Sequence, residues 1–386
     1  MSATSPRALA FGGLLALASA IGIGRFVYTP ILPPMADALD LTKSEAGLIA
    51  SANFVGYLVG ALAAASVRGS SPRTWLLGAL AVSAVTTAAL GWSHGMAGYL
   101  VWRFIGGVAS AYVLVLASAL VLERLSASGH ARLSAIHFSG VGTGIVVSAL
   151  LTWALAAAGF GWRAMWLAAG AIALAGTAAV ALLVPEGSPA SQGVTGAASG
   201  ATKSDGRLRA LVLAYGLFGF GYIITATFIV AIVRGSPEAV SVEPVFWLVL
   251  GLCAVPSVAL WVAAGRRLGV MRAFALACLI EAVGVFASVA WPTIAGLLLA
   301  SALLGGTFMG LTALGLIAAR DLAPAETRRW VGLLTAAFGL GQIVGPVVAG
   351  YGFDWTGSFF LPSMLAVAAL CVGAYLALAI SRRHTA

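Results

Sequence analysis

Apolar residues run through this chain in blocks of about 20, separated by short polar stretches. At a rise of 1.5 Å per residue, about 20 residues in a helix cross a hydrocarbon core of roughly 30 Å. The pattern therefore predicts an all-α polytopic membrane protein with twelve membrane-spanning helices. We place these spans at residues 9–36, 44–67, 74–92, 96–122, 133–158, 163–184, 208–233, 244–264, 271–290, 293–319, 330–350 and 358–381.

The composition agrees with this pattern. Hydrophobic residues make up 61% of the 386 residues, and charged residues only 9%, whereas soluble domains have roughly 45–50% and about 25%. These values exclude a soluble enzyme and a disordered chain. The net charge of +9 would suggest a nucleic-acid partner in a soluble protein. Here the basic residues stand between apolar spans, so the predicted partner is the lipid bilayer and not nucleic acid.

One connection between spans is much longer than the others. Residues 185–207 are rich in Gly, Ser, Ala and Thr, a composition typical of a flexible linker. We therefore expect an N-terminal six-helix bundle at 1–184, a linker at 185–207 and a C-terminal six-helix bundle at 208–386. The first span lacks a cleavage site before the next span, so we expect it to remain as a membrane helix.

The loops indicate the orientation, because Lys and Arg are retained on the cytoplasmic side of a membrane. With the N-terminus inside, sixteen of the 21 basic residues fall in cytoplasmic positions. Only Lys43, Arg163 and Arg234 fall outside, and Arg25 and Arg103 lie within spans. This distribution predicts a multi-pass protein of a bacterial inner membrane with both termini and the linker in the cytoplasm.

The two halves of the chain resemble each other at a nearly constant offset of 197 to 199 residues. Such self-similarity indicates a repeated structural unit. The matching pairs are Gly22 to Arg25 with Gly219 to Tyr222, Arg68 and Arg73 with Arg267 and Arg272, Gly106 and Gly107 with Gly305 and Gly306, and Gly140 and Gly142 with Gly339 and Gly341. Two six-helix repeats are typical of secondary transporters.

These features resemble the major facilitator superfamily over essentially the whole chain. The run from Arg103 through Gly107 to Ala111 is similar to its helix-four motif, and the run from Gly22 to Met35 is similar to the first helix of the YbfB-like (YbfB/YjiJ) branch. The resemblance implies a transporter, not an enzyme, in which two bundles alternate access to a central site lined by the first helix. It also implies a monomer.

The resemblance also implies a cytoplasmic gate built from four arginines, one pair in each half. Arg68 and Arg73 follow the second span, and Arg267 and Arg272 follow the eighth. The superfamily usually has an acid in this loop, but here that position is Val67. The predicted gate therefore lacks the acid of the family's charge relay.

Ionisable groups within spans are candidates for function, because a charge in the bilayer core costs about 2.5–3.5 kcal/mol on insertion scales. Arg25 lies about 15 Å before Met35 along the helix, near the midplane, on a stripe of small and polar residues. We predict that it binds substrate, although an arginine held by carbonyls freed at Pro30 would fit the same pattern. Arg103 either contacts substrate or organises neighbouring helices.

Two further groups could carry a coupled proton. Glu281 is the only carboxylate away from the ends of a span, and His137 near the cytoplasmic end of the fifth span can titrate near neutrality. The alternatives are a structural acid at Glu281 and an interfacial histidine at position 137. Cys253, Cys278 and Cys371 all fall within spans, and their spacing indicates neither a disulfide framework nor a metal site. We predict no cofactor.

Polar and aromatic residues on the other predicted central helices complete the candidate substrate site. They are Tyr28, Asn53, Tyr57, Tyr112, Tyr222, Thr225, Trp247, Phe338 and Gln342. Tyr222 is the strongest of these, because the repeat places it at the position of Arg25. Each of the aromatic residues could instead be ordinary packing between helices.

The predicted function is proton-linked transport of a small organic anion such as a carboxylate. The central spans contain two cations and no acid, and an anion would offset the desolvation of those cations. The first alternative is a proton antiporter that exports apolar or neutral compounds such as drugs. Against it, the helix-five motif of drug antiporters is reduced to Gly140 and Gly144 without its proline. A non-transporting membrane receptor is the second alternative.

Overall fold

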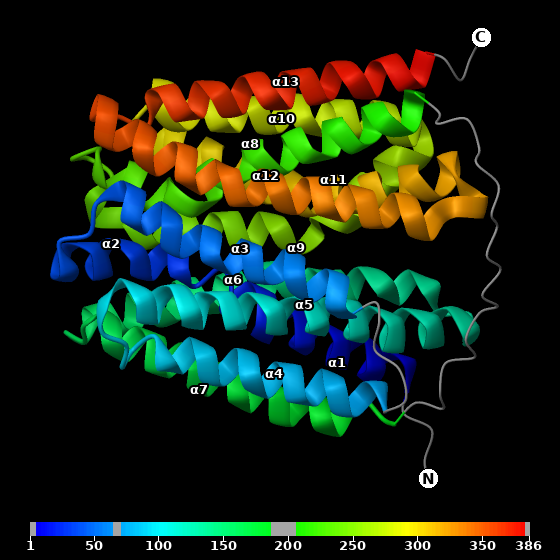
Figure 1. Cartoon of the computed structure of the whole chain (residues 1–386), viewed down its shortest axis with the longest axis horizontal. Helices are drawn as coiled ribbons and strands as arrows, with labels where there is room; N and C mark the ends of the chain where they lie inside the picture. The colour runs from blue at the N-terminus through cyan, green and yellow to red at the C-terminus, as the bar shows by residue number, and fades with distance from the viewer. Residues whose placement is uncertain (1–4, 65–70, 187–205, 383–386) are drawn as a thin grey trace.

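The computed structural model describes residues 5–64, 71–186 and 206–382, apart from the side chain of Arg328. Every regular element in these residues is a helix, and the helices form two halves that lie side by side (Figure 1). The first half holds α1 (Pro6–Leu17), η1 (Ala18–Ile23), α2 (Tyr28–Leu39), α3 (Lys43–Ala64), α4 (Pro72–Ala89), α5 (Gly95–Ala127), η2 (Ala131–Leu133), α6 (Ser134–Ala157) and α7 (Trp162–Leu183). The second half holds α8 (Gly206–Arg234), η3 (Val240–Val242), α9 (Glu243–Leu268), α10 (Val270–Ala290), α11 (Ile294–Leu322), η4 (Pro324–Glu326), α12 (Thr327–Thr356) and α13 (Phe360–Arg382).

The twelve predicted spans correspond to the helices in order, with α1, η1 and α2 together forming the first span. In the described part of the chain, eleven segments are long and apolar enough to cross a membrane. The third predicted span is α4, which has 18 residues. The fold class is therefore confirmed. Most of the predicted linker at 185–207 lies outside the described residues.

The first span is not the continuous helix that its sequence predicts. Its middle is a π-helix, η1, followed by a turn at residues 24–27 before α2 begins. Pro30 has no N–H to donate to the carbonyl of Phe26, and the N–H of Thr29 donates to that carbonyl instead, at 3.2 Å. In a regular helix the Thr29 N–H would bond the carbonyl of Arg25. The proline thus leaves a carbonyl free in the middle of the membrane span.

Both the first residues of α1 and the last residues of α13 lie at one end of the bundle (Figure 1). We call it the terminal end, and the opposite end the distal end. The halves meet where α3 packs along α12, α6 along α9, and α2 against α8. Close approach of α3 and α12 depends on glycine. A Cβ at Gly47 would collide with the carbonyl of Pro346, and one at Gly350 with the carbonyl of Lys43.

Four charged side chains form what we call the distal latch. Asp354 on α12 accepts the backbone N–H groups of Lys43 and Ser44, at 3.1 and 2.9 Å, and so caps the N-terminus of α3 from the other half. Arg234 on α8 contacts Asp37 of the first half at 2.7 Å and Glu243 of its own half at 2.6 Å. Helix N-termini leave N–H groups unpaired and favour negative charge, so the Asp354 contact stabilises closure at this end.

We expect Asp354→Ala to open the distal end. Loss of an N-cap costs about 0.5–2 kcal/mol, which would shift closure several-fold. Ser51 lies at the interface between the halves, where its hydroxyl donates to the Ile343 carbonyl at 2.7 Å. A cysteine at this position, in a protein whose native cysteines have been replaced, reports the opening. Its labelling by a membrane-impermeant maleimide should become several-fold faster.

The matched control is Glu238→Ala, which removes an exposed acid of the same end and should leave the labelling rate unchanged. Equal rates in the Asp354→Ala protein and in its parent would contradict the latch. Labelling is done in right-side-out and in inverted vesicles, so the experiment also reports which side of the membrane the distal end faces.

Candidate functional site

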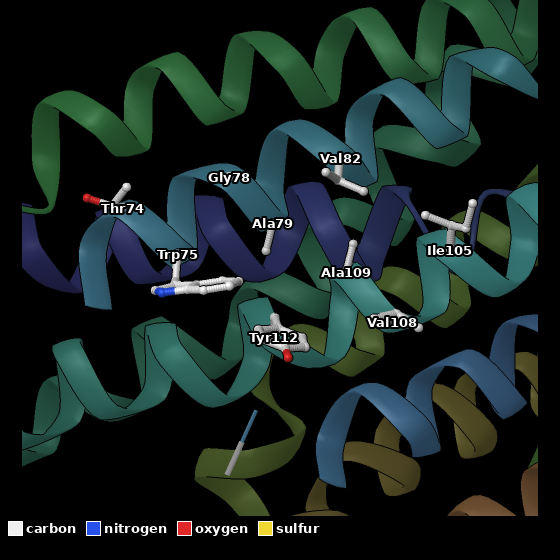
Figure 2. A pocket seen from close by; sticks show the side chains of 9 residues that line it. All are labelled: Thr74, Trp75, Gly78, Ala79, Val82, Ile105, Val108, Ala109 and Tyr112. Atoms are coloured by element: carbon white, nitrogen blue, oxygen red, sulfur yellow. The ribbon is translucent and has the colours of Figure 1, made fainter. Parts of the chain in front are cut away.

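An apolar groove of about 680 Å³ runs between α4 and α5 on the side of the first half (Figure 2). Trp75 and Tyr112 stack within it, with ring centroids 5.9 Å apart. Trp75 and Val82 in its wall are exposed on the outer surface of the bundle, and none of its lining residues is acidic or basic. The structure places Tyr112, a predicted substrate contact, in this lateral groove and not in the cluster around Arg25.

Arg25 lies in the break of the first span and is only 5% exposed. Its guanidinium carbon lies 4.5 Å from the ring centroid of Phe54 and 4.7 Å from that of Tyr57, both on α3. Cation–π contacts of this kind stabilise a desolvated cation by about 2 kcal/mol or more. Among the described residues, neither Nε nor Nη2 of Arg25 has a hydrogen-bond partner. The guanidinium is therefore buried with donors to spare.

Arg103 on α5 has a different environment. Its Nη1 donates to the carbonyls of Gly24 and Arg25 at 3.4 and 3.3 Å, and its Nη2 also reaches the Arg25 carbonyl at 3.4 Å. These carbonyls belong to the break in the first span. Asn53 in turn donates to the Arg103 carbonyl at 2.9 Å. Arg103 thus holds the break in place, the organising role that the sequence left as an alternative.

Tyr28 also belongs to this supporting layer. Its hydroxyl donates to the carbonyl of Ala46 at 2.8 Å. Its ring lies 4.8 Å from the Arg103 guanidinium carbon and 6.3 Å from the ring of Trp166. In this structure the hydroxyl and the ring of Tyr28, a predicted substrate contact, thus have partners within the first half.

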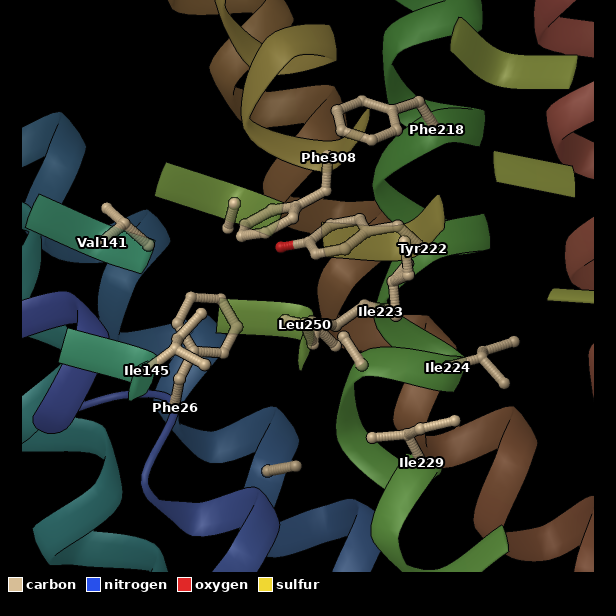
Figure 3. Packing of buried hydrophobic residues seen from close by; sticks show 14 of the residues in the cluster. Phe26, Val141, Ile145, Phe218, Tyr222, Ile223, Ile224, Ile229, Leu250 and Phe308 are labelled. Carbon is tan, nitrogen blue, oxygen red and sulfur yellow. The ribbon is translucent and has the colours of Figure 1, made fainter. Parts of the chain in front are cut away.

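The second half faces Arg25 with aromatic rings. Tyr222 on α8 lies nearly parallel to Phe308 on α11 and to Phe338 on α12, with ring centroids 5.7 Å apart in each pair. We call these three rings the ring wall. Phe26, the neighbour of Arg25 in sequence, meets Phe308 edge to face at 6.0 Å. Figure 3 shows the Tyr222 hydroxyl pointing toward the first half, with Phe26 and Phe308 beside it.

Polar groups at the edge of the ring wall are partly unpaired. The Gln342 amide donates to the Tyr222 hydroxyl, but its carbonyl oxygen has no partner among the described residues, and neither has the Thr225 hydroxyl. Trp247 instead donates to the Ser148 hydroxyl on α6 at 3.0 Å. It joins the halves nearer the distal end and does not reach the wall.

The two predicted proton carriers are both fully buried. His137 on α6 lies 3.2 Å from the Ser118 hydroxyl through Nε2, and its Nδ1 has no partner in the described residues. Neither carboxylate oxygen of Glu281 on α10 has a partner there either, and Thr307 is the polar side chain beside it. Each side chain thus keeps at least one polar atom without a hydrogen-bond partner among the described residues, and the two lie in different halves.

Comparison with known proteins agrees with this architecture. Residues 17–378 match the model of the family described as uncharacterised MFS-type transporter YbfB. The chain belongs to this family. A mutant form of the nucleoside transporter NupG matches the structure with a TM-score of 0.74 at 15% identity, and a second NupG structure with 0.72 at 16%. Each comparison covers 97% of this chain and 98% of the NupG chain. No curated protein matches the sequence.

These findings establish a multi-pass membrane transporter of the MFS fold, whose family implies a small-molecule substrate. At such identities the likeness to NupG shows the fold alone. The substrate of this YbfB-family chain must therefore be inferred from its own residues.

The four predicted gating arginines of the transporter do not share one role in the structure. Arg73 donates to the carbonyls of Val184 and Ala181 at 2.7 and 2.6 Å, and so binds the C-terminal end of α7. Arg267 and Arg272 are exposed at the terminal end, where Arg272 lines a groove with Asp321. Arg68 lies outside the described residues. The predicted role of these arginines in gating remains untested.

Within the described ranges, no cluster of His, Cys, Asp and Glu side chains could hold a metal ion. The predicted substrate contacts do not include Phe26, Phe54 or Phe308 of this site. Phe54 could have been found, because Asn53, Phe54 and Tyr57 are spaced to share one face of α3. Phe26 could not, because it lies in the unpredicted break.

Replacing each buried arginine by Met should separate their roles. Arg103→Met leaves the Gly24 and Arg25 carbonyls without a donor, which costs about 1–3 kcal/mol for each buried group left unpaired. Arg25→Met removes a buried charge that makes no hydrogen bond through Nε or Nη2 to the described residues, and such a change is often neutral or stabilising. We therefore expect Arg103→Met to lower the melting temperature in detergent and Arg25→Met to preserve or raise it. Equal destabilisation by the two would contradict this assignment.

Proposed function

We propose that this chain is a secondary transporter of a small organic anion, such as a carboxylate, and that it alternates access between its two halves. The observation that carries the proposal is Arg25. It is a buried cation at the junction of the halves, and two of its guanidinium nitrogens have no partner among the described residues. Tyr57, Tyr222, Phe338 and Gln342 are the other predicted substrate contacts that lie around this junction.

The energetics favour an anion. Placing an arginine in the bilayer core costs about 2.5–3.5 kcal/mol on insertion scales and more in simulations. Rings such as Phe54 and Tyr57 offset this cost by about 2 kcal/mol or more for each desolvated cation–π contact, but they leave the Nε and Nη2 donors without a partner among the described residues. A bound carboxylate would satisfy these donors, because it can pair with the guanidinium through two parallel hydrogen bonds. A cationic substrate would add to the repulsion.

Export of apolar or neutral compounds is the second candidate. The ring wall and the apolar groove between α4 and α5 favour it, because both present flat or apolar surfaces without charge. The NupG structures carry the name of a nucleoside transporter, and nucleosides are likewise uncharged at their bases. Neither compound class carries a negative charge to pair with the free guanidinium edge of Arg25.

Counterflow in proteoliposomes separates these candidates. The panel contains monocarboxylates, dicarboxylates, nucleosides and lipophilic cations. We expect exchange of carboxylates that falls about ten- to hundredfold in Arg25→Met, the factor for a charged hydrogen bond of about 1.5–3 kcal/mol. Arg132→Met, at an exposed position, serves as the control. Exchange of nucleosides or cations alone, or full activity of Arg25→Met, would overturn the proposal.

We further propose that transport is proton-linked, through Glu281 or His137 or on the substrate itself. Glu281→Gln keeps the shape of the side chain but cannot release a proton. If Glu281 is the carrier, this variant should lose accumulation driven by a pH gradient and retain counterflow, which needs no net proton movement. His137→Gln is tested in the same way. Gradient-driven accumulation that survives both substitutions would exclude both residues.

The charge distribution supports an orientation with the distal end outside and both termini in the cytoplasm of a bacterial inner membrane. The linker at 185–207 would then connect a bundle at 1–184 to a bundle at 208–386 on the cytoplasmic side. The maleimide experiment on Ser51→Cys tests this orientation, because labelling should be faster from the outside. Faster labelling from the cytoplasmic side would contradict it. We expect the transporter to work as a monomer.

A further inference from the structure

Anion transport alone does not specify the body of the substrate that carries the negative charge. We infer that this body is a planar aromatic ring, so that the substrate class is an aromatic or heteroaromatic carboxylate. This inference rests on the proposed function. It concerns the surface of the second half that faces Arg25.

The internal repeat places that surface opposite Arg25. Thr29 donates to the carbonyl of Ala226 at 2.9 Å, and Arg234 contacts Asp37 at 2.7 Å. Both contacts join residues 197 positions apart, so equivalent residues of the two halves face each other along this line. Tyr222 is the residue 197 positions after Arg25. The positive charge and the ring wall therefore lie on opposite sides of one pseudo-twofold axis.

The three rings of the ring wall have nearly parallel planes. The plane of Tyr222 differs from that of Phe308 by 8° and from that of Phe338 by 6°, although the three rings come from three helices. Phe218, one turn before Tyr222 on α8, continues the stack at 28° and 5.2 Å. Rings that pack only to fill space adopt edge-to-face and tilted arrangements as readily as offset-parallel ones. Parallel ring planes suit a flat ligand better than a branched or puckered one.

Arg25 presents the matching end of the site. Its guanidinium carbon lies over the rings of Phe54 and Tyr57, and these rings supply no oxygen acceptor for its N–H donors. The N–H donors lie in the plane of the group and point from its edge, where Nε and Nη2 are unpaired in the described residues. A carboxylate fits this edge with two parallel bonds, and the flat body attached to it would then reach the ring wall.

Binding of two matched probes tests the inference. Benzoate and cyclohexanecarboxylate have the same number of carbons and the same charge, but only benzoate is flat. Hydrophobic burial does not favour benzoate, because cyclohexane exposes at least as much apolar area as benzene. Stacking on an aromatic ring favours benzoate, and one aromatic pair lowers its dissociation constant about two- to tenfold. We measure dissociation constants from the rise in melting temperature of the full-length protein in nanodiscs with increasing probe concentration.

We expect wild-type protein to bind benzoate about two- to tenfold more tightly than cyclohexanecarboxylate. In a Phe308→Leu, Phe338→Leu double variant the ratio should approach one. The matched control is Phe228→Leu, which removes a fully buried ring outside the ring wall. Phe228 lies on α8, the helix of Tyr222, and its ring centroid lies 5.0 Å from that of Phe359. This variant should keep the wild-type ratio. Because each ratio compares two probes in one protein, a loss of stability alone does not change it.

The outcomes distinguish this inference from the proposed function. Equal binding of the two carboxylates, with both lost in Arg25→Met, would overturn the aromatic substrate and leave anion binding in place. An unchanged preference in the double variant would overturn the role of the ring wall. Stabilisation by benzyl alcohol without stabilisation by either carboxylate, or no binding of any probe, would overturn both.

Discussion

The site depends on the bond between Arg103 and the broken first helix. No water is available in the bilayer core, so every backbone carbonyl there needs a donor from the protein. The break in the first span leaves the carbonyls of Gly24 and Arg25 outside the regular helical bonds, and the Arg103 guanidinium binds both. Without that donor the break would be too costly to persist, and the first span would have no bend from which Arg25 could reach the junction.

This arrangement assigns opposite tasks to two buried arginines. Arg103 uses Nη1 and Nη2 on the fold and leaves only Nε without a partner among the described residues, and its guanidinium carbon lies over the ring of Tyr28. Arg25 rests on rings and keeps donors unused among the described residues. A guanidinium whose two terminal nitrogens already bond the backbone gains less from a ligand than one that keeps both Nε and Nη2 unpaired along one edge. The difference between the two lies in hydrogen bonding, because both are almost fully buried.

Much of the architecture could be predicted from the sequence, because bilayer thickness determines helix length and the repeat determines the halves. The break in the first span could not, since helix periodicity continues through residues 18–27 and only the backbone bonds reveal the π-helix. Arg25 and Tyr222 could be paired from the repeat offset alone. Tyr112 could not be placed, because its helix has a lateral face as well as a central one. Arg73 matched a gate motif, yet it binds a helix end, and such backbone acceptors leave no trace in the sequence.

The repeat also explains why the two halves contribute different chemical groups to one site. In the pair formed by Arg25 and Tyr222, one half supplies charge and the other supplies a ring, so a substrate that uses both must contact both halves at once. Binding then favours states in which the halves approach each other around the ligand, since only differential affinity can shift such an equilibrium. The helix α2, which follows the break that holds Arg25, and the helix α8, which holds Tyr222, carry Asp37 and Arg234 at the distal end, with the Thr29 contact to Ala226 between. Under the proposed function, α2 and α8 connect the site to the distal latch, and an anion that neutralises Arg25 would change the energy of moving the halves.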